Sequence, residues 1–227
     1  MIAPLMLLAA VPAAAAERSF PTGGGFDRIT NSTPFDVFVH TGRAPGVHVV
    51  GSDEAIKRLE LDNRGGELRI GTKSSGWFSG WRWGSNVRAR IDVTVPALVS
   101  ARVSGPGNVT IDTVRVRDFG AHVSGPGNVK VGALDASGVT LSLSGPGDIA
   151  IAGRAARAVM TVSGPGNIHA EQLRLGQANV TVSGPGGVDA TVTNSADVRV
   201  SGPGDVRIRG GARCNIQRSG PGEVKCG

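Results

Sequence analysis

The tetrapeptide Ser-Gly-Pro-Gly occurs seven times between residues 104 and 222 of this 227-residue chain, and successive copies start 18 to 20 residues apart. The copies lie at 104–107, 124–127, 144–147, 163–166, 183–186, 201–204 and 219–222. Most copies follow a Val or Leu and precede an Asn or Asp, with apolar and variable residues alternating on both sides. A fixed period of this length indicates one structural unit stacked on itself.

The alternation predicts a strand before and after each tetrapeptide, and Pro-Gly predicts a sharp corner between them. Proline presets φ at the first central position of a turn, and glycine permits the positive φ that a type II turn needs at the second. Hairpins fit poorly, because the apolar residues fall in the same columns at every repeat. One column is Val109, Val129, Ile149, Ile168, Val188, Val206 and Val224, and another is Val103, Val123, Leu143, Val162 and Val182. We therefore predict a single-stranded parallel β-helix, an all-β solenoid with coils of about 20 residues lying about 4.8 Å apart.

The residue after each tetrapeptide is usually Asn or Asp, which predicts a ladder of side chains along the corner. The members are Asn108, Asn128, Asp148, Asn167, Gly187, Asp205 and Glu223. A calcium site is disfavoured, because calcium-binding β-helix repeats have a nine-residue period and hard cations need several oxygen ligands.

The N-terminal region differs in composition from the repeats. Residues 1–16 are uncharged and end in an Ala run, which indicates a secretory signal peptide. A membrane anchor is disfavoured because the run is short and contains Pro4 and Pro12, so we expect an exported protein that is not transmembrane after cleavage.

Residues 17–25 are expected to be a flexible lead-in to one domain, 26–227. Within that domain, we expect irregular first coils and a cap over 26–99, a helical turn or two in 53–61, and the repeats over 100–227.

Cys214 and Cys226 are the only cysteines and lie 12 residues apart. An exported chain meets an oxidising compartment, so we predict a disulfide that staples the last coil. Two buried free thiols are the alternative.

The chain resembles a known protein family. The lead-in Val95-Pro96-Ala97-Leu98 and the repeated Ser-Gly-Pro-Gly-Asn/Asp-Val are similar to the bacterial "putative auto-transporter adhesin, head GIN domain" family, whose members often carry Ser-Gly-Ser-Gly-Asp. The resemblance covers roughly residues 26 to 226. It implies a right-handed parallel β-helix in a bacterial protein exported to the periplasm, the cell surface or the medium, and it supplies no catalytic residues to carry over.

The net charge of +6 would attract anionic polymers. Lys and Arg are nevertheless scattered, and no nucleic-acid motif is present, so we expect a solvated surface and no specific nucleic-acid partner. The outward row of the repeats places His169, Asp189 and Arg207 in one line, and there too a solvated face is the preferred interpretation. The histidines show no metal-ligand spacing, and no cofactor loop is found, so neither a metal nor a cofactor is predicted.

The segment from Trp77 to Trp83 concentrates recognition-type side chains. It contains Trp77, Phe78, Trp81, Arg82 and Trp83. These rings either cover one end or flank of the helix as a cap, or form an exposed loop that stacks on sugars or docks a partner.

We therefore expect a non-enzymatic binding, adhesion or scaffold module of the cell envelope, with a glycan or surface component as its partner. The alternative is a polysaccharide-active enzyme, a lyase or hydrolase, built on the same scaffold. A groove with converging acids would favour the enzyme.

Overall fold

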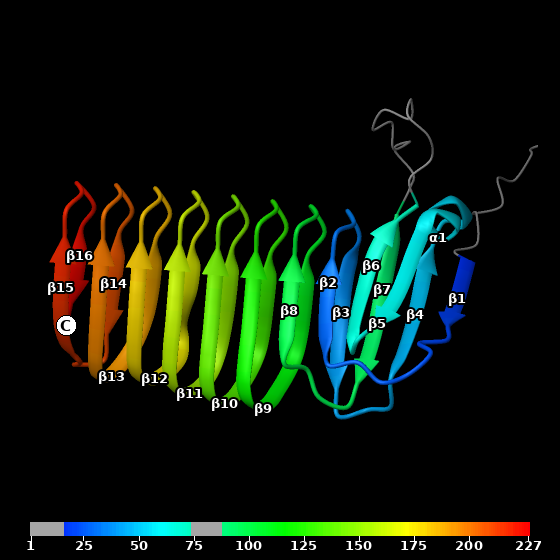
Figure 1. The fold of residues 1–227 in the computed structure, drawn as a ribbon, viewed down its shortest axis with the longest axis horizontal. Coiled ribbons are helices and arrows are strands. Elements are labelled where there is room, and N and C mark those ends of the chain that lie inside the picture. The colour runs from blue at the N-terminus through cyan, green and yellow to red at the C-terminus, as the bar shows by residue number, and fades with distance from the viewer. Residues whose placement is uncertain (1–15, 74–87) are drawn as a thin grey trace, which may run out of the picture.

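The seven tetrapeptides lie one above another along one edge of a long parallel β-solenoid (Figure 1). The structure is a computed structural model that describes residues 16–73 and 88–227. This part of the chain is almost entirely strand. The elements are β1 (Ala16–Phe20), β2 (Arg28–Asn31), β3 (Asp36–Thr41), β4 (Gly46–Gly51), α1 (Asp53–Arg58), β5 (Leu59–Arg64), β6 (Glu67–Thr72), β7 (Ala89–Val95), β8 (Ser100–Val103), β9 (Val109–Val123), β10 (Val129–Leu143), β11 (Ile149–Val162), β12 (Ile168–Val182), β13 (Val188–Val200), β14 (Val206–Arg209), β15 (Arg213–Arg218) and β16 (Val224–Cys226).

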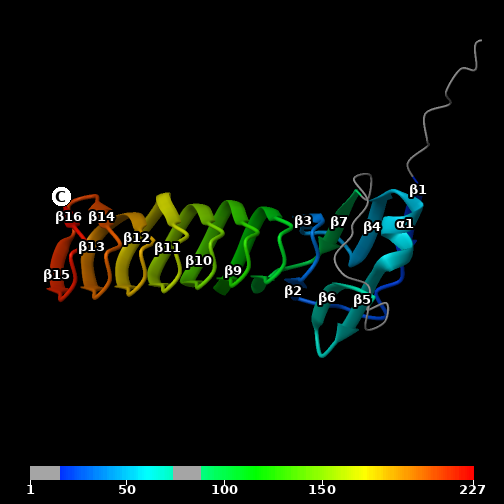
Figure 2. The same cartoon turned by 90° about the horizontal axis from the view of Figure 1, so that it is seen from above.

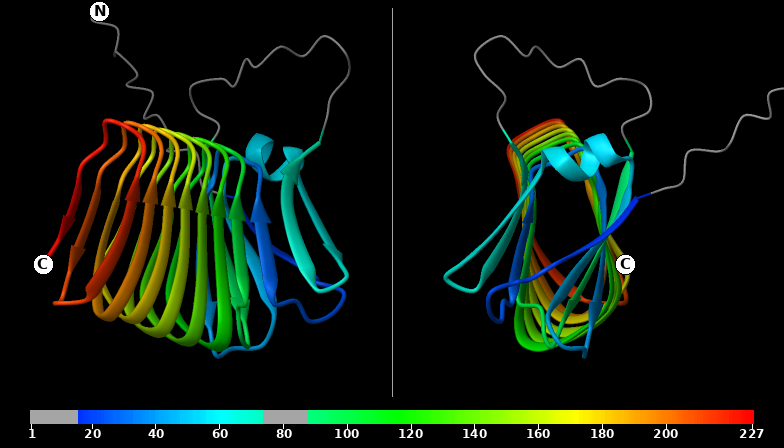
Figure 3. Two further views of the ribbon diagram at one scale, coloured as in Figure 1. Left: turned by 60° about the vertical axis from the view of Figure 1, so that its left-hand side comes forward. Right: turned by 90° about the vertical axis from the view of Figure 1, so that its right-hand side faces the viewer.

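Each of the long strands β9 to β13 makes most of one coil. It runs away from the tetrapeptide on one face, bends and returns on the other face, so the coil is a narrow loop with two broad sides (Figure 3). In β9 the adjacent residues Arg117 and Asp118 are both exposed and interrupt the alternation of buried and more exposed residues. Neighbouring coils pair in parallel, and the predicted parallel β-helix is therefore confirmed.

The two predicted apolar columns form the core. Val109, Val129, Ile149, Ile168, Val188 and Val206 pair in succession, and each is 0% or 1% exposed. The second column is likewise buried from Val103 to Val182 and continues to Val200. Val224 keeps the register but is half-buried, because it lies in the last coil of the stack.

The prediction of a type II turn with positive φ at glycine is wrong. None of the tetrapeptide glycines is among the residues with positive φ. Glycine is needed there for space, because successive corners stack with their backbones in contact. A Cβ on Gly127 would lie 2.3 Å from the carbonyl oxygen of Gly107, and one on Gly186 would lie 1.9 Å from that of Gly166. Any side chain would therefore push neighbouring coils apart.

The predicted Asn/Asp ladder is present along the corner. Asn108 Oδ1 accepts from the backbone N–H of Asn128 at 3.0 Å and from its side-chain Nδ2 at 2.8 Å. Asn128 Oδ1 accepts in turn from the N–H of Asp148 at 2.7 Å. The ladder continues to Gly187, which has no side chain to extend it, and resumes where Asp205 Oδ1 accepts from the N–H of Glu223.

One further corner, which the sequence analysis missed, lies between β2 and β3. Ser32-Thr33-Pro34-Phe35 takes the position of a tetrapeptide: Ser32 Oγ lies 2.8 Å from Ser104 Oγ, and Gly107 N–H donates to Thr33 O at 2.9 Å. Asp36 begins the ladder, because its Oδ1 accepts from the N–H of Asn108. Of the repeat motif, this corner retains only Ser-x-Pro-x-Asp, followed by alternating apolar residues.

The N-terminal coils are not stacked in chain order. β2 lies between β6 and β8, and β3 lies between β7 and β9, so β6 and β7 come before β2 and β3 in the stack although they follow them in the sequence. Beyond them, β5 and β4 pair in antiparallel fashion with β6 and β7 and, together with α1, cover this end (Figure 2). The helical turn predicted in 53–61 is confirmed by α1, which Ser52 caps through its side chain.

The expected flexible lead-in needs correction at its start. Glu17 to Phe20 belong to β1, which pairs in antiparallel fashion with β4 from Ala16↔Gly51 to Phe20↔Val47. One edge of β4 pairs with β7 and β1 pairs with the other, because unpaired backbone groups at a sheet edge readily recruit another strand. The expected signal peptide of residues 1–16 lies, apart from Ala16, outside the described residues.

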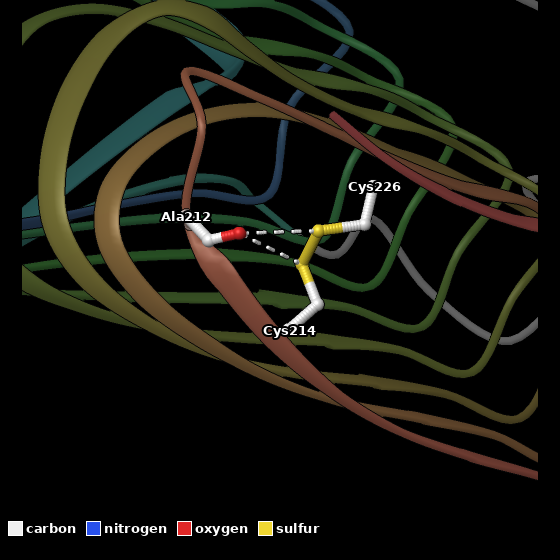
Figure 4. Close-up of a disulfide and its surroundings, with 3 residues drawn as sticks. All are labelled: Ala212, Cys214 and Cys226. Carbon is white, nitrogen blue, oxygen red and sulfur yellow. Dashed lines mark hydrogen bonds between the residues drawn. A yellow bond between two sulfur atoms is a disulfide. The ribbon is translucent and has the colours of Figure 1, made fainter.

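The predicted disulfide joins Cys214 to Cys226 across the last coil (Figure 4). Cys214 pairs with buried Ala196 of the preceding coil, and Cys226 pairs with buried Ile208. Both sulfur atoms also contact the carbonyl oxygen of Ala212. The bridge therefore connects the two faces of the coil at positions that core side chains take in the coils before it.

Candidate functional site

One outward row of side chains runs along the first face of the solenoid. Strand pairing places one member from each of the seven tetrapeptide coils in register, two residues after the corner ladder. In coil order the row is Thr110, Lys130, Ala150, His169, Asp189, Arg207 and Lys225. The predicted line of His169, Asp189 and Arg207 is confirmed. Because the row changes from coil to coil, it does not share the strict repetition of the core.

Three potential ligand groups converge at the middle of this face. His169 and Glu171 lie on β12 on either side of buried Ala170, so they point to the same side of the sheet. Asp189 pairs with His169 from β13. One nitrogen or oxygen atom of each residue lies within 4.8 Å of one from each of the others. We call these three residues the His169 cluster.

The His169 cluster has a defined polar setting. His169 Nδ1 lies 3.8 Å from Glu171 Oε1, and Asp189 Oδ1 lies 3.5 Å from Arg207 Nη1. Asp189 Oδ1 is buried and accepts no hydrogen bond from the described residues. A buried polar atom without a hydrogen-bond partner is unusual and calls for a specific explanation.

A shallow hollow of about 350 Å³ adjoins the cluster. Its floor consists of small residues from two coils, Gly132, Ala150 and Ala152, while Lys130 lies on one side and His169 and Glu171 lie on the other. The hollow exists because small side chains such as Ala150 occupy positions where the neighbouring coils have the larger Lys130 and His169. It is large enough for a sugar-sized group and has both charge signs on its rim.

A second hollow, of about 310 Å³, lies toward the bend of the coils. Arg154 and Arg174 pair in adjacent strands at its edge, and Arg154 donates to both carboxylate oxygens of Asp135 at 3.0 and 2.6 Å. The hydrogen bond from Arg154, assisted by the charges of Arg154 and Arg115, holds the pKa of Asp135 below its ordinary value. Asp135 thus remains ionised and neutralises part of this basic edge.

Sequence analysis identified His169 and Asp189 but not Glu171. The available signal was His-x-Glu on one strand, because alternate residues share a face. Trp77, Phe78, Trp81, Arg82 and Trp83 lie outside the described residues. No helix in residues 16–73 or 88–227 has both the length and the apolar character needed to cross a membrane.

The stacked corners, buried columns and variable outer row define a parallel β-solenoid with a strictly repeated interior and a non-repeating polar face. The chain belongs to the family described as "Putative auto-transporter adhesin, head GIN domain", whose model matches residues 25–212. The resemblance seen in the tetrapeptides is therefore confirmed. The family description points to a non-enzymatic, adhesion-type role for an exported or surface protein.

Solved structures share this fold. A "putative adhesin" from Bacteroides fragilis superposes with a TM-score of 0.82 at 22% identity, over 94% of this chain and 97% of that one. A "putative lipid binding protein" from Parabacteroides distasonis gives 0.68 at 20% identity, over 94% and 97% of the two chains. A "putative adhesin" from Parabacteroides merdae gives 0.66 at 17% identity, over 94% and 96%. At these identities the likeness shows the fold alone. No curated protein matches this chain.

Proposed function

We propose that this protein is exported to the cell envelope and acts there as a non-enzymatic binding, adhesion or scaffold module for a glycan or another surface component. The observation that carries the proposal is that repeated residues and variable residues have different roles within each coil. Residues that recur along the tetrapeptide coils serve stacking: the corner glycines, most of the ladder and the buried columns. The outer row varies and is free to contact a partner.

Export is supported by the Cys214–Cys226 disulfide, because such bonds persist mainly in oxidising compartments. The long solenoid with its many backbone pairings is suited to holding a surface in a fixed shape, which lowers the entropic cost of binding a polymer. Both features agree with the family description.

We propose that Trp77, Phe78, Trp81, Arg82 and Trp83 form the partner contact. Aromatic rings with a neighbouring cation suit the stacking faces of sugars. The flanking strands β6 and β7 are both part of the N-terminal coils, away from the disulfide-bonded end. The competing interpretation is that these rings cap the structure.

A glycan array probed with the mature protein tests this proposal. We expect retention on a subset of envelope or host glycans, and we expect the Trp77→Ala/Trp81→Ala/Trp83→Ala variant to lose it while its far-UV circular dichroism and unfolding midpoint stay unchanged. If the triple variant unfolds and the folded wild-type protein binds no glycan or envelope fraction, the Trp contact is refuted and the cap interpretation is favoured.

A polysaccharide-active enzyme is the second candidate, and the His169 cluster is the observation that favours it. Glu171 and Asp189 bring two carboxylates and His169 brings an imidazole to the rim of a hollow, and paired acids are what glycosidic bond cleavage uses. New reducing or unsaturated ends generated by pure protein, and abolished by Asp189→Asn, would establish this activity.

A further inference from the structure

We propose that His169, Glu171 and Asp189 bind a divalent transition-metal ion, with Zn²⁺ as the representative case. This inference goes beyond the proposed function, because it concerns the metal alone and does not depend on which partner the protein contacts. It rests on the donor set, on the buried oxygen of Asp189 that accepts no hydrogen bond from the described residues, and on the hollow beside the cluster.

The donor set fits a borderline cation. Zn²⁺ accepts imidazole nitrogen at about 2.0 to 2.1 Å and carboxylate oxygen at about 2.0 to 2.2 Å. Two such ligands around a tetrahedral ion are separated by about 3.4 Å. The three donor atoms already lie within 4.8 Å of one another, and all three residues are half-buried, so modest side-chain rotation would close the site.

The second observation is Asp189 Oδ1. It is buried, accepts no hydrogen bond from the described residues, and has Arg207 Nη1 at 3.5 Å as its ion-pair partner. Burying a carboxylate oxygen without a hydrogen-bond donor costs free energy that a bound cation would recover. The other two donors of the cluster provide the remaining protein ligands for that cation.

The hollow explains what completes the coordination sphere. Three protein ligands with a remaining open position are typical of zinc sites that accept water or an external ligand. Because Ala150, Ala152 and Gly132 leave space beside His169 and Glu171, the ion would be reachable from solvent.

Arg207 acts against the cation and makes the proposal unusually testable. Two unit charges about 4 Å apart in water interact by about 1 kcal/mol, which is roughly a fivefold change in an equilibrium constant, and a doubly charged ion interacts more strongly still. Removing the guanidinium while keeping the three ligands should therefore tighten binding at this site, whereas a site far from Arg207 would change little because salt screens distant charges.

His40 provides a matched control. It also lies between two carboxylates, but Asp112 approaches its Nδ1 at 3.2 Å whereas Asp92 approaches its Nε2 at 3.8 Å. Its acids thus contact different ring nitrogens and do not converge on one point. No free thiol competes for zinc, because both cysteines are in the disulfide.

The test is isothermal titration of tag-free mature protein with Zn²⁺ alone. We expect one saturable site per chain, weakened more than about tenfold by His169→Ala and by Asp189→Asn. His40→Ala should leave affinity unchanged, and Arg207→Gln should raise it at least about fivefold. Glu171→Gln, which keeps the size of the side chain, provides a second ligand variant should His169→Ala fail to fold. Absence of saturable binding, or binding that the ligand variants leave intact while His40→Ala removes it, would overturn the proposal.

Discussion

Gly166 stacks so closely on Gly147 that a Cβ on Gly166 would lie 1.9 Å from the Gly147 carbonyl oxygen. Both glycines are the last residue of a tetrapeptide, in consecutive coils. The obstructing atom belongs to the backbone, so no side-chain rotation can relieve the clash. The distance between coils therefore depends on glycine at this position.

We expect Gly166→Ala to destabilise the fold by about 3 kcal/mol or more, toward the upper end of the usual cost of overpacking a core. Urea denaturation of the variant measures it. Gly25→Ala is the control, because Gly25 has open space around the added Cβ and does not have a positive φ. Equal stability of the two variants would contradict the stacking account.

Asn31 is expected to hold the divergent corner between β2 and β3. It is 0% exposed, its Nδ2 donates to Phe35 O and Gly107 O, and its Oδ1 accepts from the N–H and hydroxyl of Thr33. Asn31→Val, which introduces the residue that Val103 supplies one coil later, should cost about 2 to 4 kcal/mol because buried polar groups lose their partners. Thermal unfolding measures the loss. Asn128→Ala, at an exposed ladder position, should cost less than about 1.5 kcal/mol. The reverse order of these two losses would exclude the special role of Asn31.

The disulfide should stabilise the C-terminal coil. Replacing Cys214 and Cys226 by Ser is expected to lower stability by about 3 kcal/mol in the chain-entropy model and to make residues 213–227 the first site of proteolysis. Denaturation with and without reductant measures the effect, and the double Ser variant should not respond to reductant. Two titratable thiols in unreduced, denatured wild-type protein would disprove the bridge.

The ion pair of Asp135 and Arg154 predicts a pH effect. Because hydrogen bonding from Arg154 lowers the pKa of Asp135 in the folded state, the stabilisation is present above the unfolded pKa and is lost as pH falls through the folded pKa. Carboxyl NMR titration should show Asp135 ionising below its reference value of 3.8, with Arg154→Gln moving the midpoint upward. A titration midpoint at or above that value in the wild-type protein would contradict the proposed ion pair.

Much of the repeat region was predictable because its signals are local and repeated. The valine column from Val109, the ladder at Asn108 and Asn128, and the row of His169 and Asp189 all follow from period-two alternation in register. The pairing of the two cysteines followed from their number and from the expected compartment.

Other features depended on contacts between distant segments. The role of the tetrapeptide glycines was wrongly predicted, because turn preferences describe φ within one corner whereas the constraint comes from the previous coil. The first corner was not recognised from the sequence, because Thr33 and Phe35 occupy the positions of the two glycines. The insertion of β2 between β6 and β8, and the third member of the His169 cluster, required the three-dimensional arrangement.

The central functional claim is that this solenoid binds its partner without breaking bonds. In the most direct measurement, the pure mature protein is incubated with a polysaccharide that binds it on the array. The length of the polymer and the number of new chain ends are then determined. We predict that the polymer is recovered at its original length with no new ends. Progressive shortening by the wild-type protein that Asp189→Asn abolishes would contradict the claim and establish an enzyme.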